Sequence, residues 1–110
     1  MPRYFITIPD SGKLASAGEF AFRSVGAEGL AEELQAALRG DALFQRWVAT
    51  QDDPDGVDPR LAATDPSATV EGRQDDLHID LIIDSALNGE AFKHRMRLLA
   101  GSHWQLRDVR

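Results

Sequence analysis

The feature that most constrains the fold is a stretch of alternating character, DDLHIDLIID, at residues 75–84. Every second residue from Leu77 to Ile83 is aliphatic. Successive side chains of a β-strand point to opposite faces, so this period predicts a strand with one buried and one solvated face. The short run at residues 68–73 predicts a partner strand, joined to the first by a tight turn near residues 74–75. The two runs together predict an antiparallel hairpin.

Periodicity along the rest of the chain predicts the other elements. Apolar residues three or four positions apart indicate amphipathic helices, and Asn88 and Gly101 are suited to cap and end the last one. Their order with the strands indicates an α+β domain, with a mainly antiparallel sheet of about five strands and two to three helices packed on one face. This arrangement is loosely ferredoxin-like. The predicted strands are residues 3–8, 19–25, 68–73, 75–84 and 104–109, and the predicted helices are residues 27–39, 42–49 and 89–100.

Length and composition limit the classes of protein to consider. The chain has 110 residues and no cysteine, which predicts a single domain over residues 1–110 and excludes disulfides, thiolate zinc sites and cysteine nucleophiles. Three of the five prolines and five aspartates lie in residues 51–67, which predicts a long Pro/Asp-rich loop. No window approaches the ~20 apolar residues of a membrane span. We therefore expect no membrane contact and a cytoplasmic location.

Charge is divided unevenly along the chain. The formal net charge is −6, yet residues 93–110 hold five of the twelve basic residues and one of the eighteen acidic residues. An acidic body repels nucleic acid, so binding to nucleic acid is not expected of the molecule as a whole. A phosphate or RNA contact through Lys93, Arg95 and Arg97 of the predicted C-terminal helix is one alternative function.

The polar side of the opening stretch is the main candidate for chemistry. Asp76, His78 and Asp80 share one face of the predicted strand, and imidazole and carboxylate are competent metal ligands. Asp76 and Asp80 would lie ~13 Å apart, too far to share one ion. We therefore expect neither a metal nor a cofactor. A small-molecule- or metal-binding enzyme with a polar centre at His78 and Asp80, and with residues 51–67 as a lid, is a further alternative.

Two tryptophans complete the candidate residues. Trp47 and Trp104 each carry a large apolar area, and we expect both to pack inside the domain. An exposed tryptophan would instead be the best anchor for a protein partner. No P-loop, dinucleotide-binding or serine-nucleophile motif is present, so no catalytic residue is predicted.

The hypothesis favoured by this pattern is a small cytosolic protein-interaction or regulatory module that is not an enzyme. A chain with an acidic body and a basic end can associate with itself through opposed charges, which predicts a homodimer or binding to another protein. Such an association would weaken as salt is added. Binding of a small-molecule ligand at His78 and Asp80 remains an alternative.

Overall fold

The computed structural model describes residues 2–110 and contains one sheet of four antiparallel strands in the order β2-β3-β1-β4. The strands are β1 (Arg3–Ile8), β2 (Thr69–Asp75), β3 (His78–Asp84) and β4 (Gln105–Val109). The α-helices are α1 (Ala27–Arg39), α2 (Ala42–Val48) and α3 (Gly89–Ala100), and the 3-10 helices are η1 (Ser11–Ala17), η2 (Pro54–Gly56) and η3 (Pro59–Ala62).

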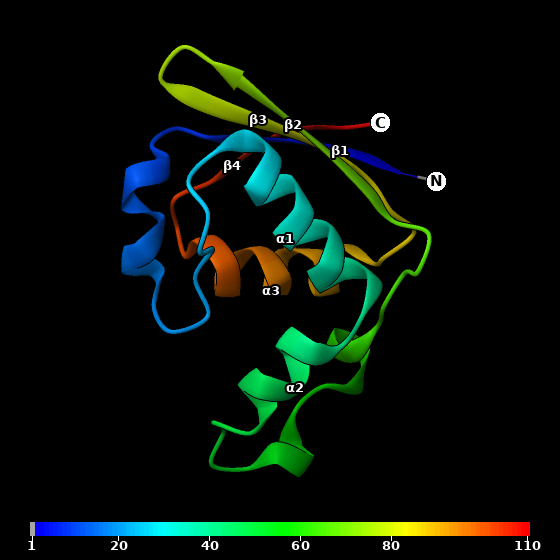
Figure 1. Cartoon of the computed structure of the whole chain (residues 1–110). Coiled ribbons are helices and arrows are strands. Elements are labelled where there is room, and N and C mark those ends of the chain that lie inside the picture. The colour runs from blue at the N-terminus through cyan, green and yellow to red at the C-terminus, as the bar shows by residue number, and fades with distance from the viewer. Residues whose placement is uncertain (1) are drawn as a thin grey trace.

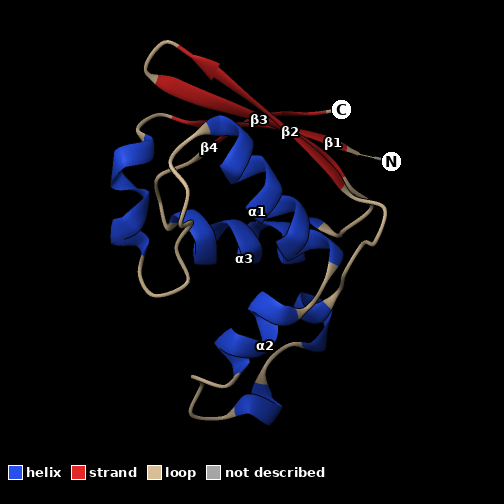
Figure 2. Ribbon diagram, in the orientation of Figure 1, coloured by secondary structure: helices blue, strands red, loops and turns tan. Residues whose placement is uncertain are grey.

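The helices lie on one side of the sheet, and the other side is left uncovered (Figures 1 and 2). The connection through α1 joins two strands with β3 between them, and α3 joins two strands with β1 between them. This arrangement confirms the α+β class and the antiparallel sheet. The ferredoxin-like likeness stays an interpretation. None of the helices in the described part of the chain has the length and apolarity needed to cross a bilayer.

The prediction of about five strands is wrong, because residues 19–25 form an irregular loop. A strand was predicted there because Phe20 and Phe22 would share one of its faces, but the two rings lie in different places. The backbone N–H of Phe22 donates to the carbonyl oxygen of Leu99 at 2.8 Å, and its ring is buried in the core. Phe20 instead lies against the guanidinium of Arg46, 5.5 Å from its ring centroid. The loop is therefore held by helices and not by a ladder.

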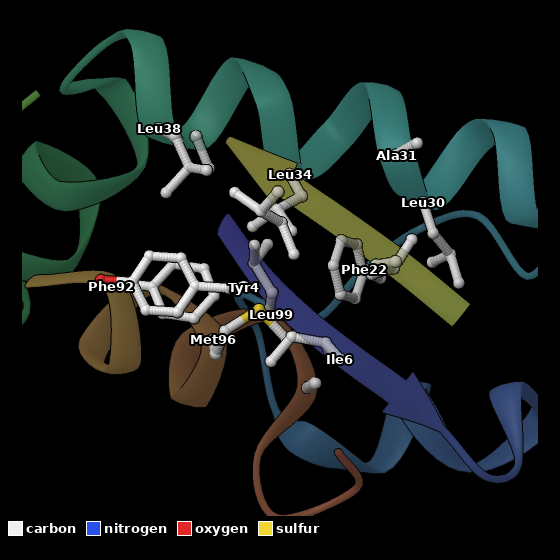
Figure 3. Packing of buried hydrophobic residues seen from close by; sticks show 14 of the residues in the cluster. Tyr4, Ile6, Phe22, Leu30, Ala31, Leu34, Leu38, Phe92, Met96 and Leu99 are labelled. Atoms are coloured by element: carbon white, nitrogen blue, oxygen red, sulfur yellow. The ribbon is translucent and has the colours of Figure 1, made fainter. Parts of the chain in front are cut away.

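The core fills the space between the sheet and the two long helices (Figure 3). Tyr4 of β1 stacks on Phe92 of α3, with ring centroids 4.2 Å apart. Leu30, Leu34 and Leu38 of α1 are buried over the same sheet face. Their spacing of four residues keeps one face of the helix on the sheet, as the sequence predicts.

The hairpin is confirmed, but its turn lies two residues later than predicted. β2 runs through to Asp75, which pairs with His78, so the turn is formed by Asp76 and Leu77. Asp76 has the left-handed value φ 55, and Leu77 is 84% exposed instead of buried. The rest of the alternation holds, because β1 pairs with β3 and brings the aliphatic residues of both strands to the helical side.

Residues 51–67 lie on the helical side of the sheet and include η2 and η3. Asp65 holds the end of this segment in place. Its backbone N–H donates to the carbonyl oxygen of Leu38 at 2.8 Å, and its carboxylate accepts from the backbone N–H of Ala86 at 2.8 Å. The hydroxyl of Ser67 donates to the same carboxylate at 2.8 Å. The bonds to its carboxylate lower the pKa of Asp65, with the bond from Ala86 as the largest cause.

Candidate functional site

The uncovered face of the sheet carries the side chains that alternate with the core residues. On β1, for example, Tyr4 and Ile6 face the helices and are buried, whereas Phe5 between them faces outward. Outward positions are Arg3, Phe5 and Thr7 of β1, Glu71, Arg73 and Asp75 of β2, His78, Asp80, Ile82 and Asp84 of β3, and Arg107 of β4.

A hollow of about 350 Å³ lies near the middle of this face, lined by residues from all four strands. Phe5 and Ile82 pair across β1 and β3 and give the hollow an apolar floor. At one side, the hydroxyl of Thr7 donates to the carboxylate of Asp80 at 2.8 Å. The Nε of Arg107 donates to the same hydroxyl at 3.3 Å. An apolar floor beside fixed polar groups can receive an apolar side chain and orient its neighbours.

Arginines form much of the rim of the hollow. Arg73 lines it and pairs with Glu71 at 3.1 Å, in an exposed ion pair on the same strand. The guanidinium of Arg110 lies 5.1 Å from the ring centroid of Phe5. Among residues 2–110, Arg107 has no carboxylate within ion-pair distance. This side of the face can therefore accept a carboxylate from another molecule.

A second group of polar side chains lies at the hairpin end of the face. The Nε2 atom of His78 is 3.6 Å from Oδ2 of Asp75 and 3.4 Å from Oδ2 of Asp80. One ligand atom from each residue lies within 4.8 Å of the others. The predicted partner Asp76 is replaced in this cluster by Asp75, because the later turn places Asp75 opposite His78. These three side chains have the chemistry of a divalent-cation site.

The three basic residues singled out on α3 do not form one surface. Lys93 and Arg97 are exposed, whereas Arg95 is fully buried. The guanidinium of Arg95 donates to the backbone oxygens of Leu61 and Ala63, and it lies 5.3 Å from the ring centroid of Phe44. Among the described residues its Nε has no partner. Burial lowers the pKa of this guanidinium.

His94, which sequence reasoning passed over, is buried beside Arg95. Its ring packs edge-on against Trp47 of α2, with centroids 4.3 Å apart, and its Nδ1 has no partner in the described part of the chain. Burial lowers the pKa of His94, and the positive charges of Arg95 and Arg97 lower it further. Helical spacing is the signal that was available, since His94 lies three residues after the buried Ala91 of α3.

Both tryptophans are half-buried and packed against other residues. Trp47 lies 5.7 Å from Phe44, centroid to centroid, within α2. Trp104 packs against the hydrophobic core, and its Nε1 donates to the backbone oxygen of Gly101 at 3.0 Å. Residues 51–67, the suggested lid, pack on the helical side near Arg95, whereas His78 and Asp80 lie on the uncovered face. Their position does not support a lid over that site.

No family model matches this chain, and no curated protein or solved structure matches it either.

Proposed function

We propose that this protein is a small, non-catalytic interaction module in the cytoplasm, which binds a protein partner through the uncovered face of its sheet. The observation that carries the proposal is the hollow of about 350 Å³ at the centre of that face. Its floor is apolar, from Phe5 and Ile82, and its rim holds Arg73 and Arg107. Protein interfaces have this anatomy, with an apolar centre, a polar rim and a preference for aromatic residues and arginine.

The chemistry of the hollow specifies the kind of partner segment. Phe5 and Ile82 favour an apolar side chain, because its burial removes apolar surface from water at roughly 25 cal/mol per Å². Arg107 donates to a hydroxyl and has no carboxylate within ion-pair distance among residues 2–110, so it favours a carboxylate next to that apolar side chain. The partner is therefore a polypeptide segment in which an acidic residue and an apolar residue lie close together.

Selection of random peptides displayed on phage tests this proposal directly. We expect peptides selected on the purified protein to combine an acidic residue with a nearby aromatic or aliphatic residue. Arg73→Glu reverses a rim charge and Ile82→Thr reduces the apolar floor while keeping a β-branched side chain. Each should weaken binding of a selected synthetic peptide by about tenfold or more, measured by fluorescence anisotropy.

Arg97→Glu is the matched control, because Arg97 is exposed on α3, on the other side of the sheet. Its affinity for the same peptide should stay within a factor of about two of the unchanged protein. Equal binding by the Arg73→Glu, Ile82→Thr and Arg97→Glu variants would contradict the proposed surface. A selection that enriches no common peptide pattern would contradict the proposed class of partner.

A second candidate function is the binding of a divalent cation by Asp75, His78 and Asp80. It is favoured by the convergence of one ligand atom from each residue within 4.8 Å. Two adjacent strands supply the ligands, so the hairpin ladder holds them in register before any ion arrives. One imidazole nitrogen with carboxylate oxygens suits Zn²⁺ or Mn²⁺, and water would complete the coordination of so exposed a site.

Isothermal titration with Zn²⁺ and with Mn²⁺ tests this candidate. We expect binding of one ion per chain, abolished in the Asp75→Asn variant because the amide is a far weaker ligand than the carboxylate. The matched control is Asp76→Asn, next along the chain, since Asp76 lies outside the cluster and asparagine also tolerates its left-handed backbone. Loss of binding in both variants, or in neither, would contradict the assigned ligands.

A further inference from the structure

The edge strand β4 has apolar side chains that nothing in the described chain covers. All five of its residues are exposed. Leu106 is 38% and Val109 48% exposed, and they are two of the four large hydrophobic residues exposed on the molecule's described part. They pair with Ile6 and Tyr4 respectively, so both point to the helical side of the sheet. Apolar side chains on a free edge mark a surface suited to another strand.

The backbone of β4 also has groups directed away from the sheet. Arg110 and Arg3 exchange both of their backbone hydrogen bonds, at 2.8 and 3.1 Å. In an antiparallel ladder alternate residues bond to the same neighbour, so Val109 directs its N–H and C=O to the free edge. The N–H of Val109 donates to the carboxylate of Asp108 at 2.8 Å. A neighbouring strand can take the place of this local bond.

We propose that two copies of this chain pair antiparallel through β4, about a two-fold axis between Arg107 and Asp108. In this register Leu106 of each copy lies opposite Val109 of the other, on the same face. Arg107 of each copy lies opposite Asp108 of the other. The strand is therefore self-complementary, because the dimer would contain two apolar pairs and two pairs of opposite charge.

Charge order selects this register over its neighbours. A shift of one residue in either direction places Arg107 opposite Arg107, or Asp108 opposite Asp108, and like charges directly opposite each other destabilise a sheet. Charged side chains on an edge strand usually prevent pairing. Here the charges have opposite signs in consecutive positions, so they disfavour both one-residue shifts and favour the proposed register. The bulge between the partners of Phe5 and Ile6 is present in both copies and leaves the two-fold relation intact.

This inference rests on the proposed interaction function and names a second copy as one partner. Pairing at β4 would join two four-stranded sheets into one of eight strands and leave both uncovered faces open. Each face would keep its hollow, with Arg73 on the rim to meet the carboxylate of a partner segment, because Arg107 would face Asp108 of the other copy. A dimer of this kind would present two binding hollows on one continuous surface, which raises the affinity for partners that carry two segments.

Cysteine cross-linking tests the register, and the natural chain contains no cysteine to interfere. In the proposed dimer Gln105 of one copy faces Arg110 of the other. We expect the double variant Gln105→Cys/Arg110→Cys to form a covalent dimer under mild oxidation. Gln105 pairs with Thr7 and Arg110 bonds to Arg3, so within one chain the two positions are separated by ~13 Å, beyond the reach of a disulfide.

The two single variants are the matched controls. Each places its two cysteines ~13 Å apart in the dimer, so neither should cross-link. Cross-linking by the double variant alone supports the register, and equal cross-linking by a single variant, or none by the double variant, overturns it. Sedimentation equilibrium of Leu106→Lys should show a monomer, whereas Val25→Lys, at a position 64% exposed elsewhere, should remain dimeric.

These outcomes separate the inference from the function on which it rests. A monomeric protein, or a dimer unaffected by Leu106→Lys, overturns pairing through β4. Peptide binding that still depends on Arg73 and Ile82 would then leave the proposed function standing. If the unchanged protein were a monomer and its peptide binding did not depend on Arg73 or Ile82, both proposals would be overturned.

Discussion

The guanidinium of Arg95 donates to the backbone oxygen of Ala63 at 2.8 Å, although Arg95 itself is fully buried. It also donates to the oxygen of Leu61, so one side chain of α3 holds the end of η3 and the residue that follows it. Arg95→Met keeps much of the volume and leaves two part-buried oxygens without these donors. We expect a loss of roughly 2–5 kcal/mol in the free energy of unfolding, measured by urea denaturation.

Arg97→Met is the control for this prediction, because Arg97 lies on the same helix but is exposed. Its free energy of unfolding should stay within about 0.5 kcal/mol of the unchanged protein. If Arg95→Met were equally stable, the two carbonyl bonds would contribute nothing, and the account of this segment would be wrong.

Acid should weaken the attachment of residues 51–67 through Asp65. Its pKa is lowered by the bonds from Ala86 and Ser67, so the folded state holds the carboxylate more strongly than the unfolded chain does. The resulting stability is present above the unfolded value near ~3.9 and is lost as pH falls through the lower folded pKa. Urea midpoints across acid pH should fall less steeply for Asp65→Asn than for the exposed control Asp55→Asn. Parallel curves would refute this assignment.

His94 should add a second acid-sensitive component at higher pH. Its pKa is lowered by burial first and by Arg95 and Arg97 second, so the unfolded chain binds a proton before the folded one. The contribution of His94 to the free energy of unfolding is fully present above the pKa of the unfolded chain, near ~6.5. It declines as pH falls toward the lower folded pKa. His94→Phe should remove this decline, whereas His103→Asn should retain it. Urea unfolding followed by tryptophan fluorescence provides the measurement, and an unchanged decline in His94→Phe would exclude His94 as its source.

The close approach of β2 to α1 depends on Gly72. A Cβ added there would overlap the backbone oxygen of Ala27, which cannot move without displacing the helix. Gly72→Ala should therefore cost about 1–3 kcal/mol of the free energy of unfolding. The control Gly89→Ala meets nothing within 4 Å at the start of α3, so its stability should be unchanged or slightly higher. Thermal unfolding compares the two, and similar melting temperatures would contradict the stated contact.

Local periodicity was sufficient to predict the three helices and all four strands of the sheet. The error at residues 19–25 arose because Phe22 reaches the core from a loop, and two alternating aromatics cannot distinguish that loop from a strand. The turn was misplaced because register depends on the partner strand. Pairing of Ile79 with Ile8, a contact between residues far apart in sequence, determines where β3 begins.

Contacts between strands also decide which residues of the candidate site could be predicted from the sequence. His78 and Asp80 were identified from their shared face, but the third member, Asp75, comes from the neighbouring strand. The hollow at Phe5 and Ile82 takes its lining from four strands and has no local pattern. Arg95 was grouped with exposed cations although it lies three residues after Phe92 and four before Leu99, on the face of α3 that turns toward the core.

Binding of a partner segment to the uncovered face can be mapped by NMR with a selected peptide. Titration of the ¹⁵N-labelled protein should produce its largest backbone amide shift changes in β1 and β3, around Phe5, Thr7, Asp80 and Ile82, which surround the hollow. Shift changes confined to α1 and α3, on the covered side of the sheet, would contradict the account.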